Sequence, residues 1–429
     1  MLAPDPFTLD RRLAEVARAW LGFRRALRAG SARDHRFENQ GAFTTLELLR
    51  ELEQAPAGVF SFAQQRWVFR LGEQHLHRAA LVRSADAWWH EPPESQEIPL
   101  QRVLLSALAD RDRRGSWLRV LREHGAKLAA ERLELWQRRA ELRERLGAQR
   151  FDALWLPGGH ALEAAAKLLD ATRDAYLEHA PDDLPGLLEV LLASRAGGSF
   201  PTHLSTRSLI ELVDAVRWFE GLAIDPGKLP PPLAPASFVR GLGALGAAFA
   251  RAIKSELLAF AATRDAFGLG EHAHAALFAA LPLLPAFAQR RLEVPRHALG
   301  DFRRRLAHAL LANARATALC TLLVQPALQG GQAFRDAFSE TFARAFGLEC
   351  DPRLAGVWLM PRFDQAQRFG ALLLAAQRNH DLVQRHDEDW FRNPRAREEL
   401  RETARLPDAS ELSQQDVELG LAALERIAG

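Results

Sequence analysis

The feature that most constrains this sequence is helical periodicity along almost its whole length. Apolar residues recur every three to four positions, alternating strand patterns are absent, and Ala, Leu, Arg and Glu predominate. This pattern places an apolar stripe on one face of a helix, and it uses residues that favour helices. We therefore predict an all-α protein with two long helices, 61–90 and 117–146. Further helices are expected over residues 9–29, 45–54, 98–110, 159–179, 184–195, 207–219, 237–262, 271–292, 298–325, 331–346, 363–386, 394–405 and 412–427.

The 429-residue length bears on how these helices are grouped. A chain of this size exceeds the usual single core, so two lobes or one elongated helical body are expected. We predict an N-terminal lobe over 1–200 and a C-terminal lobe over 201–429. The Gly- and Pro-rich stretches AGGSFPT and DPGKLPPPLAP are the clearest linkers. Capping boxes are expected at Ser61-x-x-Gln64 and Ser208-x-x-Glu211.

Composition excludes several classes of protein. The formal charge is only +2, so no global field favours nucleic acid or anionic lipid. The two cysteines, Cys320 and Cys350, cannot form a disulfide framework or a Cys-type zinc site. Polar residues or prolines interrupt the most apolar runs, and the N-terminus lacks a signal-peptide pattern, so no membrane span is expected. These observations predict a cytoplasmic protein.

Standard catalytic motifs are missing from the sequence. There is no GxxxxGK[ST], no GxSxG and no HExxH. GLGALG at Gly241–Gly246 is a partial glycine match, but no strand pattern precedes it, so a dinucleotide site is not expected.

Several polar residues fall on apolar helical stripes. His124 and Glu131 share a stripe with Leu121, Leu128 and Leu135, and His75 and His380 lie on two similar stripes. Each histidine is interpreted as a core residue bonded to a nearby carbonyl, because an unpartnered buried polar group is costly. The alternative is one inward-facing polar cluster. His272 and His274 are two residues apart, so they point to different helix faces and make a poor metal pair.

The stretch HDEDWFRNPRA, from His386 to Ala396, combines a histidine and three carboxylates with two aromatic residues. It suggests either a metal or acid/base site or the junction between two helices. We favour the junction, with Trp390 and Phe391 as anchors. Asn393 is then an N-cap and Pro394 the first helical residue, where its missing N–H is not needed.

Two segments carry a resemblance to a known family. FGALLLAAQRNHDLVQRHDEDWFRNPRAREELRE and RLELWQRRAELRERLGAQRFDALWLP are similar to segments of the M3 metallopeptidases, the thimet oligopeptidase and oligoendopeptidase F group. The resemblance implies a wholly helical, bowl-shaped, two-lobed fold with a deep channel between the lobes.

The resemblance also implies where a zinc site would lie. The family's zinc helix is best matched by SFVRGLGALGAAFA, which begins at Ser237. In that alignment Gly243 stands at the first His ligand, Ala244 at the Glu base and Ala247 at the second His, while Glu271 lies near the third ligand. One carboxylate cannot supply the roughly three protein ligands that catalytic zinc needs. The alternative is that this is an ordinary packing helix.

We therefore expect no metal, no cofactor and no peptidase chemistry. The leading functional hypothesis is a non-catalytic pseudo-peptidase that binds a peptide or protein partner in a helical channel. One alternative is an enzyme with a rebuilt site, using Glu271, His272 or the set His124, Glu131 and His380. Another is a purely structural subunit. The oligomeric state stays open.

Overall fold

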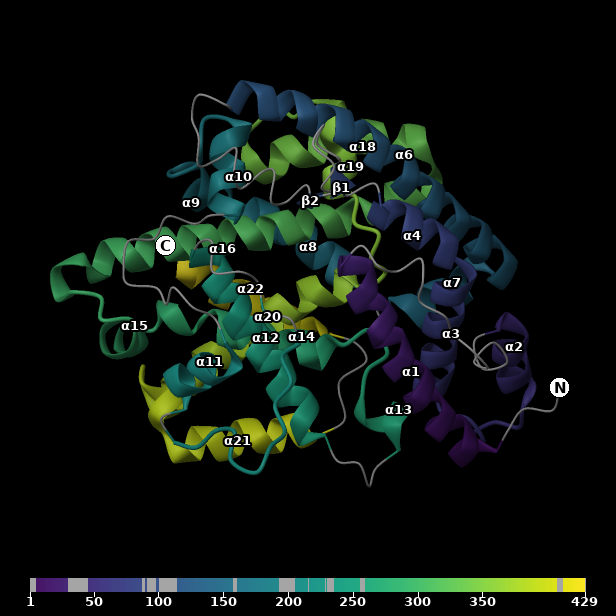
Figure 1. Ribbon diagram of the computed structural model, residues 1–429, viewed down its shortest axis with the longest axis horizontal. Coiled ribbons are helices and arrows are strands. Elements are labelled where there is room, and N and C mark those ends of the chain that lie inside the picture. The colour runs from purple at the N-terminus through teal and green to yellow at the C-terminus, as the bar shows by residue number, and fades with distance from the viewer. Residues whose placement is uncertain are drawn as a thin grey trace.

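The prediction of an all-α protein is confirmed by the structure, a computed structural model (Figure 1). It describes residues 5–29, 45–86, 89–90, 98–99, 114–156, 160–192, 205–214, 216–227, 229, 235–254, 259–406 and 412–428. In these ranges the strands are one two-residue antiparallel ribbon, in which β1 (Trp89–His90) pairs with β2 (Ile98–Pro99).

Helices follow one another along the rest of the described chain. Those of the N-terminal half are α1 (Pro6–Ala29), α2 (Leu46–Gln54), α3 (Phe62–Leu76), α4 (Arg78–Asp86), α6 (Arg114–Leu146), α7 (Ala148–Trp155), α8 (His160–Ala171), α9 (Arg173–Leu177), α10 (Leu184–Leu192) and α11 (Thr206–Val213). Those of the C-terminal half are α12 (Pro235–Ile253), α13 (Phe260–Thr263), α14 (Leu269–Ala279), α15 (Pro285–Arg291), α16 (Leu299–Leu322), α17 (Val324–Gln329), α18 (Gly331–Phe346), α19 (Ala355–Trp358), α20 (Gln365–His386), α21 (Pro394–Arg405) and α22 (Gln414–Ala428). Single 3₁₀ turns are η4 (Leu281–Leu283), η5 (Arg296–Ala298), η6 (Pro352–Leu354) and η7 (Trp390–Arg392).

Some predicted helix boundaries were wrong. The long helix expected over 61–90 is divided at His77 into α3 and α4. The helix expected over 271–292 is divided by η4 between α14 and α15, because Pro282 and Pro285 cannot continue a helical hydrogen-bond ladder. The helix expected over 98–110 lies outside the described residues, except for the strand at 98–99.

The two predicted capping boxes had different outcomes. The box at Ser61 and Gln64 is present at the start of α3 and is confirmed. The box expected at Ser208 was wrong by one turn, because Ser205 is the N-cap of α11 and Ser208 is its reciprocal partner. Ser208 Oγ accepts the Ser205 N–H at 2.9 Å, so a serine performs the role usually given to Glu or Gln.

Two hydrophobic cores hold the helices together. The first core is formed mainly by α1–α3, α6–α8, α18, α22 and parts of α14, α16 and α20. The second is formed by α11, α12, α15, α21 and the remaining parts of α14, α16 and α20. Three helices thus contribute to both cores, and the first core takes side chains from both sides of residue 200. The division into lobes 1–200 and 201–429 remains a prediction.

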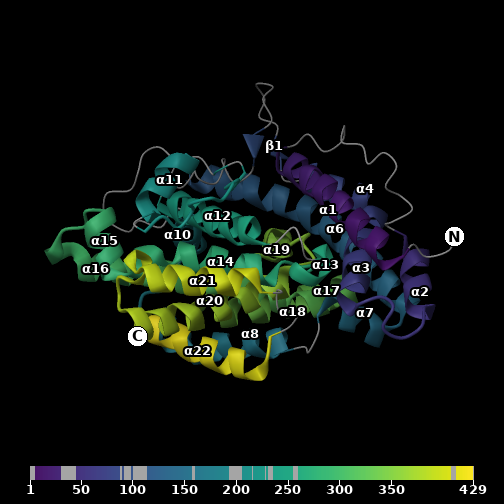
Figure 2. The same ribbon diagram turned by 90° about the horizontal axis from the view of Figure 1, so that it is seen from below.

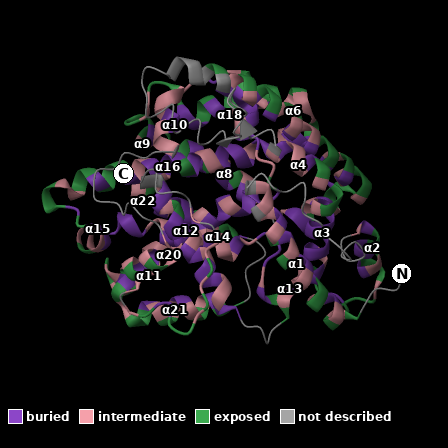
Figure 3. Ribbon diagram, in the orientation of Figure 1, coloured by how far each residue is buried: buried purple, intermediate pink, exposed green. Residues whose placement is uncertain are grey.

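Four helices form the stack that positions the site described below. α12 packs on α14, α14 on α20, and α20 on α22, and the series is visible edge-on in Figure 2. Buried residues line the facing sides of these helices, and exposed residues follow the outer faces of α6 and α21 (Figure 3). One described stretch, Arg296–Gln329, is long and apolar enough to span a membrane, but 61% of its apolar window is buried inside the protein. That burial is consistent with a core helix of a soluble protein.

Candidate functional site

The site is built on the contact between α12 and α14, which pack closely together. Gly246 faces α14 so tightly that a Cβ atom there would overlap the carbonyl oxygen of His274 and lie 2.9 Å from Phe278 Cγ. Farther toward the C-terminus of α12, the Arg251 guanidinium pairs with Glu271 at 3.0 Å. The two helices therefore run in opposite directions, and the segment Gly243–Ala247 lies beside the helix that carries Glu271.

This contact occupies the positions that the family resemblance assigns to zinc ligands. Gly243 is buried, and a Cβ atom there would lie 3.2 Å from the carbonyl oxygen of Ala275 and 3.8 Å from the Ala279 methyl group. A side chain at Gly243 would therefore press on the backbone of α14. Ala244 and Ala247 are half-buried and present only methyl groups. In this structure α12 and α14 pack directly against each other at these positions.

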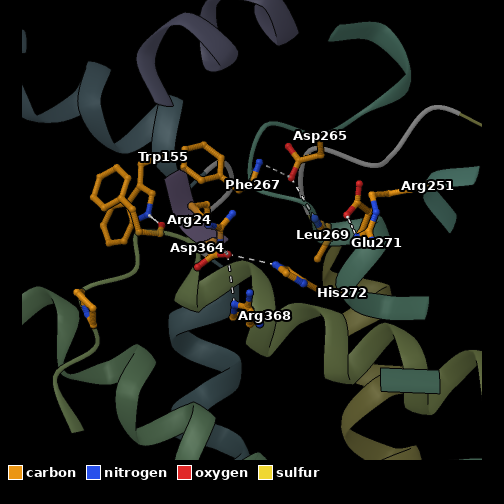
Figure 4. Close-up of polar contacts among 12 residues, drawn as sticks. Arg24, Trp155, Arg251, Asp265, Phe267, Leu269, Glu271, His272, Asp364 and Arg368 are labelled. Carbon is orange, nitrogen blue, oxygen red and sulfur yellow. Dashed lines mark hydrogen bonds and ion pairs between the residues drawn. The ribbon is translucent and has the colours of Figure 1, made fainter. Parts of the chain in front are cut away.

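A polar cluster lies at the other side of α14, where α14 meets the start of α20 (Figure 4). Its centre is Asp364, the N-cap residue of α20. One carboxylate oxygen, Oδ2, lies 3.2 Å from His272 Nε2, 3.2 Å from Arg368 Nε and 3.7 Å from an Arg24 guanidinium nitrogen. The cluster thus joins α1, α14 and α20.

The segment leading to Asp364 is held by a ladder of side-chain hydrogen bonds, mainly from α6. Guanidinium and indole N–H groups of α6 and α7 donate to the backbone carbonyls of this segment, spaced so that they lie on one face of α6. The bonds run from Arg132 to Gly356 (2.7 Å) and Leu359 (2.9 Å), from Trp136 to Met360 (3.0 Å), from Arg139 to Pro361 (3.0 Å), and from Trp155 to Phe363 (2.6 Å). The Trp155 and Phe363 rings also stack, with centroids 4.9 Å apart. These hydrogen bonds hold the backbone that leads to Asp364 in place.

The protonation states of the central pair follow from their surroundings. Burial alone would raise the pKa of Asp364, but Arg368, the His272 hydrogen bond and Arg24 together hold that pKa well below its ordinary value. Burial and the neighbouring Arg368 lower the pKa of His272 to about 3. The carboxylate is thus charged and the imidazole neutral at pH 7. Because an ionised carboxylate only accepts, His272 Nε2–H donates to Asp364 and Nδ1 carries the lone pair.

Two neighbouring ion pairs surround this centre. Asp265 pairs with Arg66 in the interior, and it also accepts the backbone N–H groups of Phe267 (3.1 Å) and Leu269 (3.2 Å) at the start of α14. Glu271 is occupied by Arg251 on the other side of the helix. Both carboxylates are therefore already matched by one arginine each.

Arg70, from α3, differs from these arginines. Its guanidinium lies over the rings of Trp67 (5.6 Å) and Phe267 (5.5 Å), and it has no hydrogen bond or ion pair to any residue in the described ranges. Burial, and then the charge of Arg24, lower its pKa to about 10. Arg70 still carries its charge at pH 7, although its side chain is almost wholly buried.

Other residues that the sequence singled out lie elsewhere. Glu131 on α6 pairs with Arg83 of α4 at 3.1 Å, and within the described chain no hydrogen bond or ion pair joins it to His380 on α20. His124 lies two turns before Glu131 on α6. His274, on α14, donates its Nδ1–H to Gly270 O and accepts at Nε2 from Arg378, away from Asp364. Of the predicted set, Glu271 and His272 are sequence neighbours on α14, and they pair with different residues, Arg251 and Asp364.

The stretch from His386 to Ala396, with its three acidic residues, forms the junction between α20 and α21. Trp390 and Phe391 are buried in the second core, and the Trp218 indole N–H donates to Phe391 O at 2.7 Å. Asn393 caps α21 by accepting the Arg395 N–H at 2.9 Å, with Pro394 as the first helical residue, so both predictions are confirmed. Over the described ranges, no group of three or more His, Cys, Asp or Glu side chains is arranged to hold a metal ion.

The sequence analysis did not predict four residues of this site, which are Arg24, Arg70, Asp364 and Arg368. Asp364 and Arg368 are spaced as a helical i, i+4 pair, which is the only local signal they offer. That signal is not distinctive in a chain with 54 acidic and 56 basic residues. Arg24 and Arg70 reach the site only through the packing of α1 and α3.

The fold is all-α, and it can be compared with those of solved structures. A solved structure of a carboxypeptidase from Pyrococcus furiosus is similar over 100% of both chains, with a TM-score of 0.50 and 12% sequence identity. No family model matches the chain, and no curated protein matches it. At this identity the likeness concerns the fold, so the expected helical peptidase-like fold is confirmed.

Proposed function

We propose that this chain is a non-catalytic member of the peptidase-like fold, related to the M3 metallopeptidases, that binds a peptide or protein segment beside α12 and α14. The observation that carries the proposal is the direct contact of α12 and α14 at Gly243 and Gly246. A metallopeptidase needs metal ligands, and this packing has glycine and alanine at the positions where the resemblance would place them.

The half-buried face next to this contact supports a binding role. Ala244 and Ala247 of α12 and Glu271 and His272 of α14 are all neither buried nor fully exposed. Small apolar groups beside polar ones give a surface on which a peptide backbone can lie while its polar groups find partners.

The binding role is tested with fluorescently labelled peptide pools and fluorescence anisotropy. Ala247→Trp adds bulk to the proposed surface and is expected to weaken binding at least tenfold. Ala343→Trp, at an exposed position of α18, is the matched control and is expected to bind as the parent chain does. Equal binding by both variants, or no binding by the parent chain, contradicts the proposal.

The non-catalytic role is tested separately, on protein dialysed against buffer and then assayed. We expect less than stoichiometric zinc by elemental analysis and no cleavage of the same peptide pools by mass spectrometry. About one zinc per chain that survives dialysis, together with cleavage, would contradict it.

A second candidate is an enzyme with a rebuilt site, and the His272–Asp364 pair favours it. A neutral imidazole oriented by a carboxylate is the arrangement of a general base. A His272→Gln variant distinguishes the two functions: it abolishes any hydrolysis found in the parent chain if this candidate is correct, whereas the binding proposal expects no hydrolysis to lose.

A further inference from the structure

The arginine cluster, defined as Arg24, Arg70 and Arg368 around Asp364, contains more positive charge than the described protein neutralises. Arg66 is matched by Asp265 and Arg251 by Glu271. Arg24 and Arg368 share the Asp364 carboxylate, Arg70 has no ion pair within the described ranges, and the neutral His272 adds no charge. Three guanidinium groups and one carboxylate therefore give this cluster a net charge of +2 among the described residues.

Burial makes this excess significant. Arg70 is nine-tenths buried, its guanidinium contacts the rings of Trp67 and Phe267, and the nearest described carboxylates lie beyond ion-pair distance. Burying a cation without a contacting anion lowers the stability of the folded protein. A bound anion would offset this loss.

The cations of the cluster are also the groups that reach solvent. The side chains of Arg24 and Arg368 are 25% and 26% exposed, whereas that of Asp364 is 4% exposed. The face that a ligand meets is therefore positive. The N-terminal end of α20, whose Asp364 side chain makes no capping hydrogen bond, adds partial positive charge at the same place.

We infer that the arginine cluster recognises a compact dianionic group carried by the bound peptide. Two neighbouring acidic side chains and one phosphorylated side chain share this chemistry. Guanidinium groups suit both, because their forked N–H donors match carboxylate and phosphate oxygens. The inference rests on the proposed function, since it assumes that a peptide lies beside α14.

The experiment uses the full chain and four labelled peptides of one sequence, all with acetylated and amidated ends so that no terminal charge contributes. The variable pair is Glu-Glu, phosphoserine-Ala, Gln-Gln or Lys-Lys. We expect the parent chain to bind at least one dianionic peptide about tenfold to a hundredfold more tightly than the Gln-Gln peptide, as for hydrogen bonds to charged groups. Whichever of the two dianionic peptides binds more tightly, Glu-Glu or phosphoserine-Ala, identifies the natural source of the charge.

Two variants assign the selectivity to the cluster. Arg70→Gln and, independently, Arg368→Gln are expected to reduce the preference for the dianionic peptide by about tenfold and to leave binding of the Gln-Gln peptide unchanged. Arg368 is partly exposed, so this variant keeps the test valid if Arg70→Gln does not fold. Arg207→Gln is the matched control, because that side chain is 90% exposed on α11.

The outcomes separate the inference from the proposed function. Equal binding of the Gln-Gln and dianionic peptides overturns the inference and leaves the proposed function standing. A preference that Arg207→Gln reduces as much as Arg70→Gln also overturns it. Absence of binding by all four peptides and by the peptide pools overturns both.

Discussion

At the residue scale, large side chains anchor the junctions between helices. Trp390 is buried against Trp218, with ring centroids 6.0 Å apart, and its indole N–H donates to Asn379 Oδ1 at 3.2 Å. Asp387 and Glu388, in the same turn, are exposed. The stability of this turn therefore depends on its aromatic residues, and its charges contribute little.

Substitutions in this turn are expected to separate these contributions. Trp390→Ala should lower the free energy of unfolding by about 3–5 kcal/mol, and Asn393→Ala by about 0.5–2 kcal/mol through the lost cap. Asp387→Asn and Glu388→Gln should each change it by less than about 0.5 kcal/mol. Urea denaturation with and without a chelator measures all four. A larger loss in the Asn and Gln variants, seen only when metal is present, would make the turn a metal site.

A buried ion pair beside the ladder behaves differently from the surface charges. Arg139 Nε donates to Glu73 Oε1 at 2.7 Å, and both side chains are almost completely buried. Arg139→Met should cost about 3–5 kcal/mol of unfolding free energy, because it leaves the Glu73 carboxylate buried without a cation. Adding Glu73→Leu should recover part of that loss. A double-mutant cycle by urea denaturation checks this, and simple additivity of the two changes would contradict it.

At the scale of elements, glycine decides how closely helices approach. Gly246 and Gly243 allow α12 to contact the backbone of α14, and Gly356 of α19 faces α6 so tightly that a Cβ atom would overlap Ala129. The first contact closes the gap between α12 and α14. The second brings the 356–363 segment within reach of the α6 ladder.

Alanine substitutions should therefore have opposite effects at matched helical glycines. Gly246→Ala should lower the free energy of unfolding by about 1–3 kcal/mol, because the added methyl group overpacks the interface. Gly300→Ala, in α16, meets nothing within 4 Å and should be neutral or stabilising by up to about 1 kcal/mol through helix propensity. Thermal and urea unfolding of both variants provide the comparison. A stabilised Gly246→Ala variant would mean that α12 and α14 are farther apart than described.

At the scale of the whole molecule, three histidines couple stability to pH. Burial lowers the pKa of His77 to about 4 and those of His272 and His274 to about 3, from an unfolded value of 6.5. Below pH 6.5 the unfolded chain binds protons at these positions and the folded chain does not. Stability is therefore complete above that pH and is lost as the pH falls toward the folded values.

The expected slope is up to about 1.4 kcal/mol per pH unit for each buried histidine, and less for His272, which is partly exposed. Urea denaturation at a series of pH values from 7 to 5 measures the loss. A His274→Gln variant that folds should show a shallower slope. A free energy of unfolding that stays constant between pH 6.5 and 5 would contradict the assigned burial.

The sequence by itself determined the class of secondary structure and the local features of its helices. Helical periodicity, the Ser61 capping box and the Asn393–Pro394 start of α21 depend on residues a few positions apart, and the structure confirms them. The long-range links were decided by tertiary structure. Arg24 and His272 reach Asp364, and Arg70 reaches Phe267, only because α1, α3, α14 and α20 pack together. Arginine is common in this sequence, and nothing local in the sequence shows which few arginines become buried. Burial and convergence, which give this cluster its excess charge, are properties of the folded chain.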